Sequence, residues 1–185
     1  MRKRHIGTIL ALILMVLPDI AAAQGLAQTP LGVPVYDPVS KRYFALMAAD
    51  KRFSKYAWTT WLEVKKQAES QVFKGVRGRL AVVDSLEVHE FLLHHFPPDQ
   101  YRFTWIGLEY LCRKKQLKWS NGQTLERGAF SAWAAKWKPD PYACGDTNFP
   151  GDYGTVAYTP QMQWVLVGRH KGYDFYFVEF PMGHE

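Results

Sequence analysis

The stretch Tyr101-Arg102-Phe103-Thr104-Trp105-Ile106-Gly107-Leu108 decides the fold. Taken at the two-residue period of a strand, it places aromatic, β-branched and apolar residues on both faces, which predicts a strand buried on both sides. Gly107 inside it predicts that another backbone segment approaches closely. Downstream, Asn121-Gly122 follows Leu117-Lys118-Trp119-Ser120. Asn-Gly after such a run predicts a hairpin, because both residues tolerate positive φ.

Two helices are expected before this strand. Thr60 and Glu63 have the spacing of a capping box, and Asp84 with Glu87 repeats it. Apolar residues recur at helical spacing after each pair. They are Trp61, Val64, Ala68 and Val72 in the first helix, and Val88, Phe91, Leu92 and His95 in the second. Pro97-Pro98 is expected to stop the second helix.

Further strands are expected on both sides of these helices. Short apolar runs with aromatic and β-branched residues predict them at 42–47, 79–83, 155–158, 163–167 and 175–180.

The order of these motifs resembles that of a C-type lectin-like domain. Its central block is matched by Trp105-Ile106-Gly107-Leu108, the Trp119-Ser120-Asn121-Gly122 turn and Phe130-Ser131-Ala132-Trp133; its first half is matched by Thr60-Trp61, Gly78-Arg79-Leu80-Ala81 and Asp84-Ser85-Leu86-Glu87. The last strand resembles that of bacterial, cysteine-poor members. The resemblance covers about 40–180. It implies an α+β fold in which two helices flank a small antiparallel sheet, with chain ends close together and a long loop region.

Residues 1–23 are predicted to be a secretory signal peptide. A basic start, Met1 to His5, precedes 12 apolar residues from Ile6 to Leu17, and Ala21-Ala22-Ala23 offers a cleavage site. An uncleaved anchor is the alternative, which we favour less because 12 residues are few for a bilayer span. We therefore expect a secreted or periplasmic chain with no stable membrane span after signal removal. Residues 24–39 are expected to be an extended lead-in and 40–181 the domain.

The charge is mildly basic. The formal net charge is +6, of which the signal segment contributes +2. The cations are dispersed apart from Arg113-Lys114-Lys115, so we expect no nucleic-acid partner.

The long loop from Ala134 to Asp152 is the expected ligand-binding region. It holds several prolines and glycines without periodicity, and a structureless loop of this length inside a compact domain is usually functional. The resemblance implies the same role. Our candidate ligand-binding residues are Trp137, Lys138, Asp140, Tyr142, Asp146 and Asn148. Trp133 matches a structural tryptophan of the family. Lys136, Lys138 and Arg113–Lys115 favour an acidic ligand.

The calcium pattern of the family is altered. Family members that bind sugar through calcium use Glu-Pro-Asn or Gln-Pro-Asp in the long loop and Asn-Asp after a late tryptophan. This chain has Lys138-Pro139-Asp140, and Val165-Leu166 after Trp164. Calcium needs six to eight oxygen ligands, so we expect no calcium cofactor and no other metal. A weak site built from Asp140, Asp146, Asn148 and Asp152 stays open as an alternative.

The two cysteines, Cys112 and Cys144, also depart from the family. Ala68 and Val178 stand where a family bridge joins the first helix to the last strand. Because an exported chain can keep a disulfide, we predict a Cys112–Cys144 bridge. The alternative is two unpaired thiols too far apart to meet.

We do not expect an enzyme. His89 and His94 miss the two-histidine zinc-protease spacing by one residue and point in different directions on a helix. The sequence has no nucleophile elbow, phosphate loop or Cys-x-x-Cys motif. We expect a recognition module that binds a glycan or a protein through the long loop. The alternative is a structural or assembly protein of the cell envelope, using the loop aromatics as a protein interface. The oligomeric state is left open.

Overall fold

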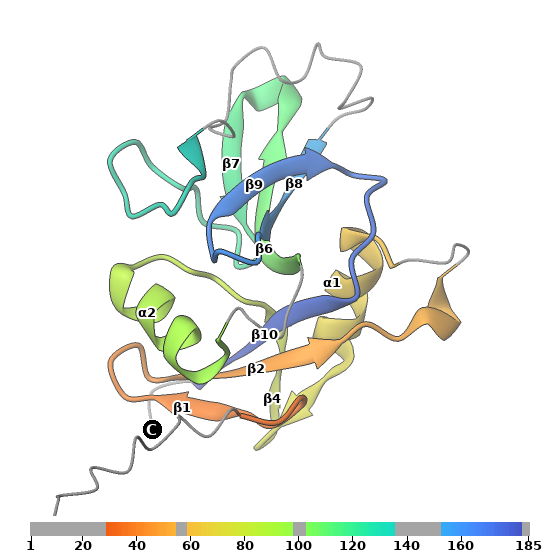
Figure 1. Cartoon of the computed structure of the whole chain (residues 1–185), viewed down its shortest axis with the longest axis vertical. Helices are drawn as coiled ribbons and strands as arrows, with labels where there is room; N and C mark the ends of the chain where they lie inside the picture. The colour runs from red at the N-terminus through yellow and green to blue at the C-terminus, as the bar shows by residue number, and fades with distance from the viewer. Residues whose placement is uncertain (1–28, 55–58, 98–102, 136–152, 183–185) are drawn as a thin grey trace, which may run out of the picture.

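The computed structural model describes residues 29–54, 59–97, 103–135 and 153–182. Its elements lie in the order β1 Val35–Asp37, β2 Arg42–Ala48, η1 Lys51–Phe53, α1 Trp61–Ser70, β3 Val72–Phe73, β4 Val76–Arg77, β5 Arg79–Leu80, α2 Leu86–His95, β6 Thr104–Leu111, η3 Cys112–Lys114, β7 Gln116–Trp119, β8 Tyr153–Tyr158, β9 Trp164–Gly168 and β10 Phe175–Pro181 (Figure 1). Both helices, the α+β class and the expected strands are confirmed, except that the strand expected at 79–83 ends at Leu80.

The sheet is mixed, which corrects the expected small antiparallel sheet. Eight strands follow the order β1-β2-β10-β6-β8-β9, with β5 added on β10 and β7 on β6. β10 pairs with β6 in parallel, through Phe175 with Thr104 and Tyr176 with Trp105. The excursion through β7, β8 and β9 allows this, because a parallel pair needs a long connection. β1, from the expected lead-in, pairs with β2, which also pairs with β10.

Helix α1 begins as predicted and ends early. Glu63 accepts hydrogen bonds from the backbone N–H and the hydroxyl of Thr60, at 2.8 and 2.9 Å, so the capping box is present. Trp61, Val64 and Ala68 are buried. Placing Val72 in this helix was wrong: the helix ends at Ser70, and Val72 begins β3 with its side chain exposed.

The predicted cap of α2 was wrong by one residue. Ser85, not Asp84, is the N-cap, and its hydroxyl accepts from the Val88 N–H. Asp84 instead forms an ion pair with Arg42 at 2.7 Å. Asp and Ser both act as N-caps, so the sequence did not reveal which of the two would cap the helix and which would pair with Arg42 of the sheet.

Strand β6 separates two cores. One face carries Ile106, Leu108 and Tyr110 into a cluster with α2, β8 and β9. The other carries Trp105 into a cluster with α1 and β10. The first five residues of β6 are fully buried, so burial on both faces is confirmed.

Gly107 is the point of closest approach. A Cβ built there would lie 2.5 Å from Ser120 Oγ and 2.6 Å from the Leu80 carbonyl oxygen. The Gly107 N–H donates to Ala81 O, and its carbonyl accepts from the Ser120 N–H. The predicted close approach is confirmed.

The hairpin after β7 is also confirmed, with one correction. Lys118 bridges to Thr124, and the Trp119 N–H donates to Gln123 O at 2.8 Å. Only Gly122 takes positive φ, at +91°; Asn121 does not use its tolerance and instead accepts from the Gln123 N–H through its side chain.

Glu179 on β10 is a buried charge with three donors. Its carboxylate accepts from Arg42, from Arg79 and from the Val82 N–H, at 3.0, 2.6 and 3.0 Å. Burial raises the pKa of Glu179, and the two guanidinium groups oppose that rise. The network joins Arg42 of β2, Arg79 of β5 and the Val82 N–H to Glu179 of β10. A buried charge of this kind is stable only while its partners are present.

Replacing Gly107 tests the close approach. We expect Gly107→Ala to lower the free energy of unfolding by about 2–3 kcal/mol, because the new Cβ meets backbone that must shift. Urea denaturation measures this. Ser120→Ala is the comparison: it removes the hydroxyl bond to Leu80 O and is expected to cost about 1 kcal/mol. A loss under about 0.5 kcal/mol for Gly107→Ala would contradict the packing described.

Candidate functional site

Residues 136–152 lie between two anchored points of the fold. Before them, the Trp164 N–H donates to Ala132 O at 2.7 Å, and the Ala134 N–H donates to Trp164 O at 3.0 Å. After them, Tyr153 begins β8 and pairs with Leu111. The first anchor lies at the start of β9 and the second beside its end, where Gly154 pairs with Gly168. A rigid frame therefore holds both ends of the segment.

An aromatic cluster forms the first anchor. The ring of Trp164 is fully buried and meets four others edge-on, at centroid distances of 5.4–6.4 Å. They belong to Trp119, Phe130, Trp133 and Tyr158. Trp133 thus has the structural role expected of it.

The two positions after Trp164, which carry calcium ligands in sugar-binding family members, lie in β9 of this structure. Val165 and Leu166 are each 3% exposed and pair with Ala157 and Val156 in the sheet. Neither side chain offers oxygen. In residues 29–54, 59–97, 103–135 and 153–182, no group of three His, Cys, Asp or Glu side chains gathers that could hold a metal ion.

The other predicted site residues lie outside the described ranges. Trp137, Lys138, Asp140, Tyr142, Asp146, Asn148 and Cys144 all fall within 136–152. Cys112 is described at the start of η3 and is not a free thiol.

His89 and His94 do not converge. The Nδ1 atom of His89 lies 2.7 Å from the hydroxyl of Tyr158, and its ring stacks on that tyrosine at 5.6 Å. His94 is exposed and meets His95 edge-on. Burial lowers the pKa of His89, an effect that Glu90 partly opposes.

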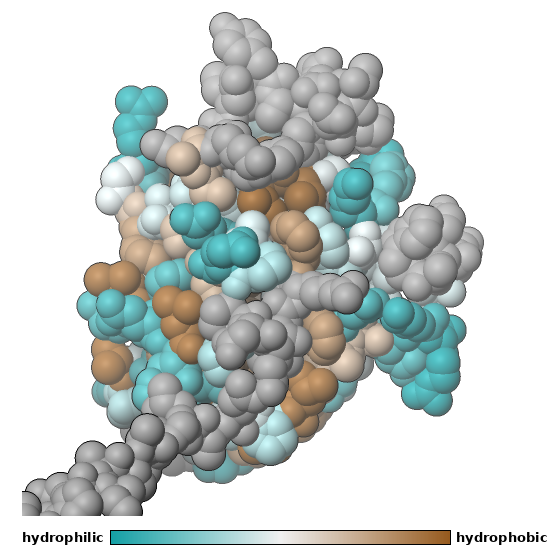
Figure 2. Space-filling model, viewed as in Figure 1, coloured by the Kyte–Doolittle hydropathy of each residue, from teal (hydrophilic) through white to brown (hydrophobic). Residues whose placement is uncertain are grey.

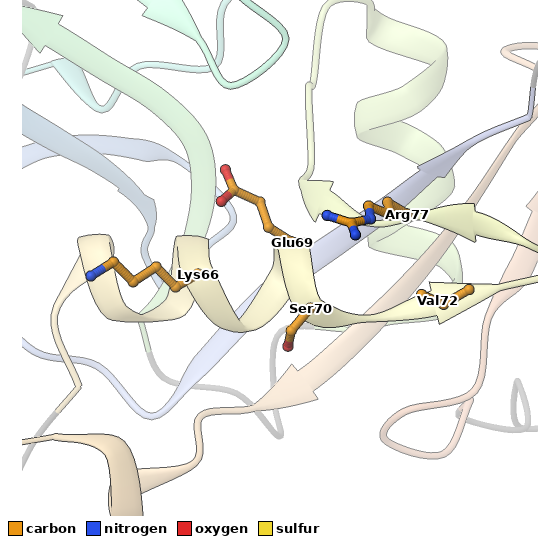
Figure 3. A pocket seen from close by; sticks show the side chains of 5 residues that line it. All are labelled: Lys66, Glu69, Ser70, Val72 and Arg77. Atoms are coloured by element: carbon orange, nitrogen blue, oxygen red, sulfur yellow. The ribbon is translucent and has the colours of Figure 1, made fainter.

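A surface hollow lies between α1 and the β3–β4 hairpin. Its lining is Lys66, Glu69, Ser70, Val72 and Arg77, and its volume is about 420 Å³ (Figure 3). All five residues are exposed. In Figure 3 Lys66 and Ser70 point away from Glu69 and Arg77, so their polar groups do not meet at one point. Such an open arrangement lacks the convergent polar groups of a ligand site.

Sequence reasoning missed a second group of basic residues, Arg169, His170 and Lys171, which follows β9 and carries the cations Arg169 and Lys171. The guanidinium carbon of Arg169 lies 5.8 Å from the ring centroid of Tyr153. The run itself is visible in the sequence, but its position beside the second anchor depends on the pairing of β8 with β9.

Figure 2 shows apolar surface near the top of the molecule with hydrophilic groups on both sides of it.

The mixed sheet, the two helices and the long segment inserted before β8 define a C-type lectin-like domain. A family profile described as "Lectin C-type domain" matches residues 66–160, just over half of the chain. The protein belongs to the C-type lectin domain family.

Solved structures agree on the fold. The cow C-type carbohydrate-recognition domain of CD23, solved in the presence of a GlcNAc2Man3 oligosaccharide, has 18% identity and a TM-score of 0.57, with 85% of this chain and 100% of that chain covered. The C-type lectin CEL-I from Cucumaria echinata has 17% identity and a TM-score of 0.53, covering 75% and 89%. Human lithostathine has 18% identity and a TM-score of 0.55, covering 85% and 93%.

No helix within the described residues is long and apolar enough to cross a bilayer.

The lowered pKa of His89 predicts a pH effect on stability. The fold favours the neutral ring, so this contribution is complete above the ordinary pKa of 6.5 and is lost as pH falls through the folded pKa. Between about pH 7.5 and about pH 5, urea denaturation should show a larger loss of unfolding free energy for the native protein than for His89→Asn. His94→Asn, at an exposed position on the same helix, is the control and should keep the native loss. Equal losses for His89→Asn and the native protein would show that His89 does not contribute.

Proposed function

We propose that this protein is an exported, non-enzymatic recognition module that binds a glycan or a protein ligand through the 134–152 loop without calcium. The family commonly performs carbohydrate or protein recognition. The residues that flank the loop are tied to the sheet at Trp164 and Tyr153, and binding residues commonly lie on loops that a rigid scaffold positions.

One observation carries the calcium part of the proposal: Val165 and Leu166 are buried apolar residues of β9 where calcium-binding relatives supply oxygen ligands. A cation needs six to eight oxygen atoms, and Lys138 stands at a further ligand position in the loop. The remaining oxygen-bearing residues, Asp140, Asp146, Asn148 and Asp152, are few for such a shell. Within this proposal Trp137 and Tyr142 stack on the ligand, and Lys138, Asp140, Asp146 and Asn148 supply polar contacts.

A glycan array tests the function, probed with the exported chain in calcium and again with a chelator. We expect the same glycans to bind in both conditions. Trp137→Ala should weaken binding about tenfold or more, because a stacking contact of about 1.4 kcal/mol is worth that factor. Tyr36→Ala is the control, since Tyr36 is 44% exposed on β1, away from the loop.

Three results would contradict parts of this proposal. Binding that the chelator abolishes would mean that calcium is used despite Val165 and Leu166. Equal losses for Trp137→Ala and Tyr36→Ala would remove the loop from recognition. Binding to nothing on the array would favour the assembly alternative. The molecular mass measured by sedimentation at several protein concentrations then tests for self-association.

We also propose that Cys112 and Cys144 form a disulfide bridge. They are the two cysteines of the chain, Cys112 is not a free thiol, and a bridge would tie the long loop to η3. Closing about 30 residues contributes about 3–4 kcal/mol in the chain-entropy account. Thiol titration of the unfolded protein should find no free thiol before reduction and two after it, and reduction should lower the unfolding free energy. Two reactive thiols before reduction would refute the bridge.

A further inference from the structure

Two cation-bearing turns lie at the same end of the sheet. Arg113-Lys114-Lys115 lies in and after η3, between β6 and β7, and Arg169-His170-Lys171 follows β9. The β6–β8 pairing of Leu111 with Tyr153 and the β8–β9 pairing of Gly154 with Gly168 bring the turns together. Figure 1 shows the end of β6 near the top of the molecule and the end of β9 at the upper right. We name Lys114, Lys115, Arg169 and Lys171 the cationic end.

Both turns are held by their backbones. The Lys115 N–H donates to Cys112 O at 3.2 Å, and Lys115 takes the left-handed conformation at φ +50°. The Lys171 N–H donates to Gly168 O at 2.9 Å. Each turn therefore holds the backbone from which its cationic side chains project. Two strand spacings separate the turns, or about 10 Å.

The cations of this end make no ion pair in the described part of the protein, although Glu109 on β6 is near enough to Tyr153 to help raise its pKa. Within the described residues, none of Lys114, Lys115, Arg169 and Lys171 forms an ion pair with a carboxylate. Asp174, which follows the second turn, pairs with Lys51 at 2.9 Å. Arg42 and Arg79 contrast with the cationic end, because Glu179 engages both.

Tyr153 lies between the turns and adds a different chemistry. Its ring is partly buried beneath the Arg169 guanidinium. Burial raises the pKa of Tyr153, so its hydroxyl stays protonated near neutral pH and can donate a hydrogen bond. A phenol edge flanked by cations suits a ligand that carries both hydroxyl and acidic groups.

We propose that the cationic end binds an anionic glycan, a polysaccharide that bears carboxylate or sulfate groups. This inference rests on the proposed function and names the class of ligand. The turns lie about 10 Å apart, so a polymer with repeated charges can contact both turns at once, and each contact adds to the binding. Residues 136–152 contribute two lysines and three aspartates, so the charge comes chiefly from the two turns.

Binding to dextran sulfate and to polygalacturonate tests the proposal, with neutral dextran and duplex DNA beside them. The exported chain is used at about 0.05 M salt, where screening is weak. Lys114→Gln with Lys171→Gln removes one exposed cation from each turn. Lys66→Gln with Arg77→Gln removes the same charge from α1 and β4, away from this end (Figures 1 and 3).

We expect the first pair of substitutions to weaken binding to both polyanions about tenfold and the second pair less than about twofold. Neutral dextran should bind to none of the three proteins, the unsubstituted chain and the two double variants. Equal losses for the two double variants would mean that net charge alone attracts polyanions, which overturns the site. Duplex DNA bound as tightly as dextran sulfate, with the same dependence on Lys114 and Lys171, would overturn the glycan assignment.

Trp137→Ala separates this inference from the proposed function. If it abolishes binding to array glycans while Lys114→Gln with Lys171→Gln leaves polyanion binding intact, the inference fails and the function stands. If polyanion binding depends on the cationic end but no ligand responds to Trp137→Ala, recognition through the loop fails.

Discussion

The close contact at Ile106-Gly107 is the constraint on which the rest of the fold depends. Trp61 of α1 donates its Nε1–H to Ile106 O at 2.7 Å, and Gly107 bonds to Ala81 and to Ser120. One helix, the segment after β5 and the β7 turn therefore meet at two residues of a single strand. The same contact accounts for the irregular β6–β8 register between Trp105 and Glu109. Gly107 gives its N–H and carbonyl to other partners, so β8 is not paired there.

How much of this was predictable from sequence depends on the range of the interaction. The two-sided burial of β6 and the close approach at Gly107 are written in adjacent residues, since period and side-chain size are local properties. Which backbone would approach, and that β10 would run parallel to β6, depend on pairings between distant residues. At Val72 the helical pattern continued past Ser70, where the helix ends. At Asp84 two adjacent capping residues were available, and the helix uses the second, Ser85.

The candidate site divides along the same line. A long aperiodic segment led to the prediction of a site between Trp133 and Tyr153, which stays a prediction. The Val165-Leu166 departure was visible in the sequence, and both residues lie in the described β9. The grouping of exposed cations in space could not be predicted in this way, because residues on the surface need not follow a periodic pattern in the sequence. Lys171 gains its proximity to Lys114 only through two strand pairings, so no local rule joins them.

The arrangement of β1, β2 and β10 has a consequence for how the domain can be displayed. Arg42 of β2 pairs with Asp37 of β1 on one side and with Pro181 of β10 on the other, so β1 and the end of β10 flank β2 in the part of the molecule away from the tips of β6 and β9 (Figure 1). A tether, surface or fused protein joined at either strand would leave those tips pointing outward. The domain is therefore suited to grafting onto a carrier, or to immobilisation on a sensor, with the proposed binding end accessible.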